Sequence, residues 1–121
     1  MLKMAKRVAA KFQIEAMANL RPSTTGVEDA VIWVSAGEFS GKELQHGPRI
    51  KVVLGDKITT DGLANAVSVK LTNPPKILGK LPSKISRQVV KFVNLNREVL
   101  LRHWNGELDS KEMLELLKRV A

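Results

Sequence analysis

The apolar residues of this chain follow two different periods, and the change between them at Leu81 constrains the fold more than any other feature. Before Leu81, short apolar segments alternate with polar residues or are apolar throughout, which is typical of β-strands. After Leu81, apolar residues recur every three or four positions, which is typical of amphipathic helices. Strands followed by helices predict an α+β domain, in which a twisted antiparallel sheet packs one face against C-terminal helices.

Three segments have the composition of strands: residues 30–36, 49–55 and 66–72. The first is rich in Val, Ile and Trp, so we expect it to be buried on both faces or nearly so. In the other two, alternate apolar residues share one face, namely Ile50, Val52 and Leu54 in the second and Val67, Val69 and Leu71 in the third. Because the connections are too short for parallel crossovers, we expect a small antiparallel sheet of three or four strands.

Two helices are predicted after Pro82. The first is expected to span about twenty residues and to end at Asn105-Gly106, because Gly commonly terminates helices. Its buried stripe has the helical period and comprises Ile85, Val89, Phe92, Val93, Asn96, Leu100 and Trp104. Asp109 and Glu112 have the spacing of a capping box, which predicts that a second, short helix begins there. On its inward side this helix is expected to carry Met113, Leu116, Leu117 and Val120.

The length of 121 residues suits one domain. We expect a single α+β domain over residues 17–121, preceded by a basic extension or arm at residues 1–16. An extra N-terminal helix is the other interpretation of residues 1–20, which are rich in Ala and slightly amphipathic. Residues 21–26 are expected to form a loop, because they begin with Arg-Pro and end with Gly.

The composition excludes several classes of site and protein. The chain contains no cysteine, which excludes disulfides, thiolate zinc sites, iron–sulfur clusters and cysteine nucleophiles. No apolar run approaches the roughly 20 residues that a membrane-spanning helix requires. Neither a phosphate-binding glycine loop nor a hydrolase nucleophile elbow occurs, and no histidine cluster has the spacing of metal ligands. We therefore expect a cytoplasmic protein with no membrane span, no metal site and no cofactor.

Basic residues are concentrated in one stretch of the chain. The net charge is +8, and no acidic residue occurs between Gly62 and Arg97. The basic residues of that stretch are Lys70, Lys76, Lys80, Lys84, Arg87, Lys91 and Arg97. Concentrated positive charge attracts polyanions, although the same residues would also keep a small domain soluble. The leading prediction is a non-enzymatic binding domain that uses these residues to dock an acidic macromolecule, either the backbone of a nucleic acid or an acidic protein.

Aromatic side chains are scarce, at 4% of the chain. Proteins that bind single-stranded nucleic acids usually stack bases on several exposed aromatic side chains. Trp33 and Phe92 lie in apolar segments, and both are expected in the core. A nucleic acid would therefore be bound through its phosphates alone, by the basic residues of the stretch 70–91.

The two histidines suggest a second hypothesis about the function of the protein. His46 lies in a loop before a predicted strand, where it could bind a phosphate or carboxylate together with Arg49; a surface turn set by Gly47-Pro48 is the simpler interpretation. His103 lies near the end of the long helix, where packing or the helix dipole accounts for it. If His46 and His103 met in space, they could act with Arg49 as general base and acid on an RNA phosphodiester without a metal. The alternative function is thus a metal-independent ribonuclease that uses His46, His103 and Arg49.

The C-terminal residues resemble a known group of proteins. Residues 89–98 (VVKFVNLNRE) and 100–107 (LLRHWNGE) are similar to the closing helix, of the LNRExLLxxWN type, of a widespread group of small bacterial domains of unknown function. The match covers the last third of the chain, and it implies a short sheet packed on this helix and a bacterial origin. Some members are encoded beside small partner proteins in arrangements that look like toxin–antitoxin modules. For the alternative function, the resemblance therefore implies a metal-independent ribonuclease-like toxin component of a toxin–antitoxin pair. The His-rich stretch of that group is not present here, where His46 alone stands near its place.

Overall fold

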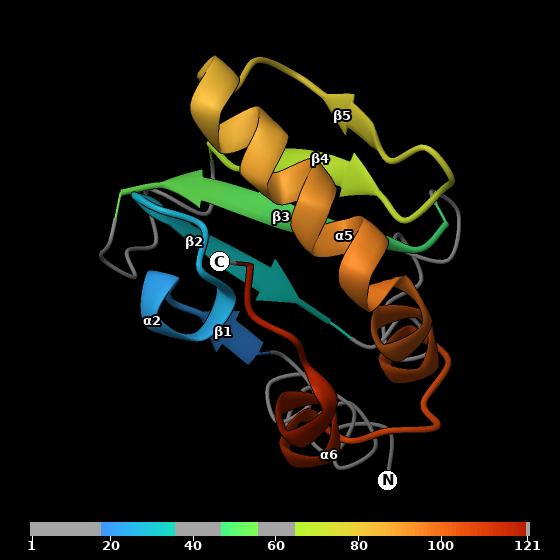
Figure 1. Cartoon of the computed structure of the whole chain (residues 1–121). Coiled ribbons are helices and arrows are strands. Elements are labelled where there is room, and N and C mark those ends of the chain that lie inside the picture. Colours follow the sequence, from blue (N-terminus) through green and yellow to red (C-terminus); the bar gives the residue numbers. More distant parts are fainter. Residues whose placement is uncertain (1–17, 36–46, 56–64, 121) are drawn as a thin grey trace, which may run out of the picture.

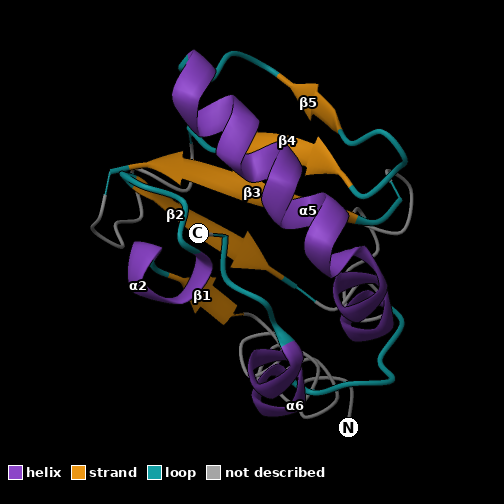
Figure 2. Cartoon of the chain, in the orientation of Figure 1, coloured by secondary structure: helices purple, strands orange, loops and turns teal. Residues whose placement is uncertain are grey.

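The computed structural model describes residues 18–35, 47–55 and 65–120, and Figure 1 shows their arrangement. The described elements are, in chain order, β1 (Ala18–Leu20), α2 (Pro22–Thr25), β2 (Ala30–Val34), β3 (Arg49–Leu54), β4 (Val67–Lys70), β5 (Lys76–Leu78), α5 (Ser83–Trp104) and α6 (Ser110–Leu116). The strands form one antiparallel sheet in the order β1-β2-β3-β4-β5. Helix α5 crosses one face of this sheet, as Figure 2 shows, and the predicted α+β fold is confirmed.

The sheet has five strands and not the predicted three or four, because a short strand lies at each edge. Strand β1 has three residues and pairs with β2, where Asn19 lies opposite Trp33. Strand β5 also has three residues and pairs with β4, where Lys76 lies opposite Lys70. Three residues are too few to show an alternating pattern, so these strands are defined by their neighbours in the sheet and not by their own sequence.

Residues 21–26 contain the short helix α2, where the sequence predicted only a loop. Pro22 lies in its first turn, where the missing N–H removes no helical hydrogen bond. Gly26 ends the helix in the left-handed conformation, with a φ of 81°, and its N–H donates to Pro22 O over 2.8 Å. The predicted arm at residues 1–16 lies outside the described residues, and the last three of residues 1–20 form β1.

The two C-terminal helices begin and end largely as predicted. Helix α5 extends over 22 residues, and its whole predicted stripe is buried. The capping box of α6 is present: Asp109 Oδ1 accepts from Glu112 N over 2.7 Å, and Asp109 N donates to Glu112 Oε1 over 3.2 Å. The helix ends at Leu116, because Leu117 adopts an extended conformation. Leu116, predicted to face inward, is 46% exposed. Val120 is buried, as predicted, but it lies beyond the end of the helix.

The core lies between α5 and the sheet. Its largest fully buried side chain is Phe92 of α5, as predicted, and it packs in one cluster with apolar residues of β1 to β4. Strand β2 is buried along both faces, as predicted, apart from Trp33, which is half-buried and does not belong to this cluster. Leu54 at the end of β3, predicted to face inward, is 52% exposed. No helix in the described ranges is both long and apolar enough to cross a membrane.

Candidate functional site

The two faces of the sheet differ in chemistry. Val34, Ile50, Val69 and Ile77 lie opposite one another on successive strands, and they belong to the core under α5 or pack against it. Because successive side chains of a strand point to opposite faces, the residues between these apolar positions point away from α5. On this face Val31 of β2 and Val53 of β3 lie opposite each other and are buried, whereas the residues of β4 and β5 and the first half of β3 are largely polar or basic.

A row of basic residues crosses this second face. Arg49 of β3 lies opposite Lys70 of β4, and Lys70 lies opposite Lys76 of β5. Because neighbouring strands lie about 4.8 Å apart, the row is roughly 10 Å long. Lys51, two residues after Arg49, points to the same face. We call Arg49, Lys51, Lys70 and Lys76 the basic sheet face; Lys76 is exposed and the other three side chains are half-buried.

The charges of this row are all of one sign. Like charges directly opposite each other on neighbouring strands destabilise a sheet. None of the five described strands contains an acidic residue that could alternate with Arg49, Lys70 and Lys76. Within the described strands, this row therefore consists of positively charged side chains alone.

A second row lies beside the first and includes an aromatic residue. From β1 to β5 its members lie opposite one another in the order Asn19, Trp33, Lys51, Ser68 and Leu78. Trp33 is half-buried, whereas Asn19 is exposed. The same face thus presents an indole ring between an amide and an ammonium group.

The seven predicted partner-binding residues are divided between the two sides of the sheet. Lys70 and Lys76 belong to the basic sheet face, whereas Lys84, Arg87 and Lys91 lie on α5, which covers the opposite face. Their spacing of three and four places the α5 residues in one stripe, and all three are exposed. Lys80 lies exposed between β5 and α5.

Two of the seven residues make structural contacts. Lys84 Nζ lies 2.6 Å from Glu28 Oε2, and the hydrogen bond and charge of Glu28 raise the pKa of Lys84 above its ordinary value of 10.5. The guanidinium of Arg97 donates to Thr72 O from Nη2 over 2.9 Å and from Nε over 3.2 Å. Arg97 thereby ties α5 to the segment between β4 and β5, and it is committed to the fold.

The residues of the alternative function lie on different parts of the fold. His103 is fully buried, and its Nε2 lies 3.3 Å from Oγ of Ser110, the first residue of α6. Arg49 points to the sheet face away from α5, the helix that carries His103. His46 lies outside the described residues. In the parts of the chain that the structure describes, no group of three or more His, Asp or Glu side chains is placed to hold a metal ion.

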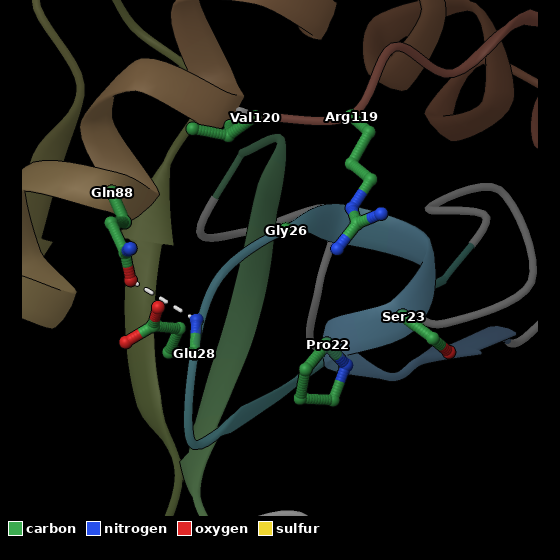
Figure 3. Close-up of a pocket in the computed structure, with 7 residues that line it drawn as sticks. All are labelled: Pro22, Ser23, Gly26, Glu28, Gln88, Arg119 and Val120. Carbon is green, nitrogen blue, oxygen red and sulfur yellow. Dashed lines mark hydrogen bonds between the residues drawn. The ribbon is translucent and has the colours of Figure 1, made fainter.

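A shallow cavity of about 620 Å³ lies where the C-terminal segment meets α2 and α5 (Figure 3). Its charged lining residues are Arg119 and Glu28, and Glu28 N donates to Gln88 Oε1 over 3.0 Å. Val120 N donates to Thr25 O over 2.8 Å, which fastens the chain end beside this cavity. Because both signs of charge line it and Glu28 already pairs with Lys84, the cavity is a junction between elements and not a selective anion site.

The sequence missed the basic sheet face because its residues come from three strands. Arg49 and Lys51 precede the acid-free stretch, and nothing local relates them to Lys70 and Lys76. The alternation within each strand does predict that these residues point away from the core. The register that aligns Arg49, Lys70 and Lys76 follows from the pairing of the strands, which a single sequence does not specify.

Comparisons with known proteins found no match for this chain. No protein-family model matches the chain, and no match was found among curated proteins or solved structures. The resemblance of the C-terminal residues to small bacterial domains therefore stays a prediction.

Proposed function

We propose that this protein is a non-enzymatic binding domain whose basic sheet face docks the phosphate backbone of a nucleic acid. The observation that carries the proposal is the row Arg49, Lys70 and Lys76, in which three like charges lie directly opposite one another. A polyanion that lies along this row would be attracted by all three charges at once.

The spacing of the row supports a phosphate backbone as the ligand. Three cationic positions follow one another across roughly 10 Å, at intervals of about 4.8 Å. Phosphates follow one another at a regular interval along a nucleic acid strand, so a row of cations can contact successive phosphates. Arginine adds a planar group that donates two parallel hydrogen bonds to one phosphate. An acidic protein, the other predicted partner, presents carboxylates with no such regular repeat.

The proposal does not extend to RNA cleavage by two histidines. His103 is fully buried against α6, where it packs beside Ser110. A general base or acid has to come within hydrogen-bond reach of the phosphodiester, directly or through one water. The burial of His103 thus gives the ribonuclease alternative no support.

A titration of matched charge variants tests the proposal. Fluorescence anisotropy of a short labelled oligonucleotide at low salt would compare wild type with the variant Arg49→Gln, Lys70→Gln and Lys76→Gln. The control variant is Arg87→Gln, Lys91→Gln and Lys111→Gln, which removes the same one arginine and two lysines from the exposed surfaces of α5 and α6. Circular dichroism of both variants checks that they are folded.

We expect the sheet variant to lose most of the affinity and the helix variant to retain it. Equal losses in the two variants would show that net charge, and not the basic sheet face, determines binding. Absence of any binding by wild type at low salt would remove nucleic acid as the partner. Capture of an acidic polypeptide such as poly-glutamate in that case would favour the acidic protein instead.

A further inference from the structure

We infer that the nucleic acid bound by the basic sheet face is single-stranded, and that Trp33 stacks on one of its bases. This inference rests on the proposed function and specifies its ligand. Trp33 lies in the row next to the cationic row and points to the same face, away from α5. Its indole is half-buried, so part of the ring reaches the surface of the sheet.

The neighbours of Trp33 suit a nucleotide. Asn19 lies directly opposite it on β1 and Lys51 directly opposite it on β3. Residues in such positions have Cβ atoms roughly 5 Å apart, and diagonal neighbours such as Arg49 lie roughly 7–8 Å away. The exposed amide of Asn19 can both donate to and accept from the edge of a base. A base stacked on Trp33 would thus lie beside the cationic row, with Lys51 as its direct cross-strand neighbour.

This arrangement favours a single strand over a duplex. The bases of a duplex are stacked on one another, so an indole on a flat sheet face reaches none of their surfaces. Bases of a single strand are free to stack on aromatic side chains, and every base has a surface that can do so. Trp104, the other tryptophan, is 5% exposed and lies at the end of α5, so it serves as an internal control.

An anionic membrane is the competing ligand for a basic face that carries a tryptophan. Peripheral membrane binding depends on several apolar side chains that enter the lipid together with the basic residues. Within the described strands, Leu78 is the large aliphatic side chain that this face exposes, at 44%. Asn19 and Ser68 lie in the same row, where a membrane would favour apolar residues.

The test uses Trp33 as its own reporter. In the variant Trp104→Phe, all tryptophan emission comes from Trp33. This variant is titrated at low salt with oligothymidylate, with an abasic oligomer of the same length, and with a duplex that carries the same number of phosphates. Wild type, Trp33→Leu and Trp33→Phe are titrated with the same three ligands, and wild type also with vesicles that contain phosphatidylserine.

We expect oligothymidylate to quench Trp33 and to bind roughly tenfold tighter than the abasic oligomer, because stacking on an aromatic side chain contributes about that much per base. The abasic oligomer should bind without quenching, and the duplex should not quench. Trp33→Leu should lose the preference for oligothymidylate, and Trp33→Phe should retain most of it. If Trp104→Phe does not fold, the comparison of wild type with Trp33→Phe, in which only Trp104 emits, provides the same readout.

Two results would overturn the inference and leave the proposed function intact. One is equal affinity for oligothymidylate and the abasic oligomer, and the other is a preference for bases that persists in Trp33→Leu. Vesicle binding without oligonucleotide binding would overturn both the inference and the proposed function.

Discussion

The side chain of Asn96 and the backbone of Lys118 bind each other through a reciprocal pair of hydrogen bonds. Asn96 Nδ2 donates to Lys118 O over 2.8 Å, and Lys118 N donates to Asn96 Oδ1 over 2.7 Å. The amide also donates to Phe92 O, one turn earlier in α5. Asn96 is 1% exposed and is the polar residue of an otherwise apolar stripe of α5. Its side chain forms hydrogen bonds with both backbone groups of Lys118, in the segment that follows α6.

Replacement of Asn96 by Ala is expected to lower the free energy of unfolding by about 1–3 kcal/mol, because it leaves a part-buried backbone donor and acceptor of Lys118 without partners. Urea denaturation measures this loss. The control is Asn94→Ala at an exposed position of the same helix, where the hydrogen bond from Arg97 is exposed to solvent. The control should lose less than about 1 kcal/mol. Equal losses would mean that the contact to Lys118 contributes nothing beyond helix propensity.

Alanine substitutions at Gly26 and Gly47 distinguish the cost of backbone strain from the cost of a steric clash. Both have a positive φ, of 81° and 76°. A Cβ at Gly26 would lie 1.9 Å from Val120 O, whereas a Cβ at Gly47 would meet no atom of the described residues within 4 Å. We expect Gly47→Ala to lower the free energy of unfolding by about 1–2 kcal/mol, through strain alone. Gly26→Ala should cost about 1–3 kcal/mol more, because the C-terminal segment has to move.

Thermal or urea unfolding of the two alanine variants provides this comparison. Similar losses in Gly26→Ala and Gly47→Ala would contradict the close contact between Gly26 and Val120. Truncation after Arg119, which removes Val120 and Ala121, should reduce the difference between the two variants, because the contact with the Val120 backbone disappears.

The ion pair of Lys84 with Glu28 predicts a pH dependence. Since Glu28 raises the pKa of Lys84 above 10.5, the folded state holds this proton more tightly than the unfolded state. The stabilisation is therefore fully present below 10.5 and is lost as the pH rises through the raised pKa. Glu28→Gln should lower the pKa of Lys84 toward 10.5, as measured by NMR titration of the lysine side chain.

Asp29→Asn is the matched control for this titration. Asp29 contributes the smallest of the effects on the Lys84 pKa, and asparagine tolerates its positive φ of 54°. The control should leave the pKa of Lys84 nearly unchanged. A pKa that stays raised in Glu28→Gln would show that a group other than Glu28 is responsible.

The salt dependence of nucleic acid binding measures how many phosphates the basic sheet face contacts. Each phosphate neutralised on a single strand contributes about 0.7 to the slope of log K against log salt. The variant with Gln at Arg49, Lys70 and Lys76 should therefore have a slope that is shallower by roughly 2. The variant with Gln at Arg87, Lys91 and Lys111 should retain the wild-type slope. If the helix variant has the shallower slope and the sheet variant retains the wild-type slope, the binding surface lies on α5 and α6 instead.

The sequence by itself determined the fold class and the two C-terminal helices. The stripe from Ile85 to Trp104 and the capping box at Asp109 depend on residues three and four positions apart, and contacts at that range can be recognised in a single sequence. The short strands β1 and β5 and the helix α2 were missed, because three or four residues carry too little pattern of their own.

Only the tertiary structure decided where the charges lie relative to one another. Lys70 and Lys84 belong to the same acid-free stretch, but the strand and the helix that carry them lie on different sides of the core. Conversely, Arg49 and Lys70, which are 21 positions apart, became direct neighbours through the register of β3 and β4. The physical reason is that strand pairing joins distant residues through backbone hydrogen bonds, whose register no local side-chain pattern specifies.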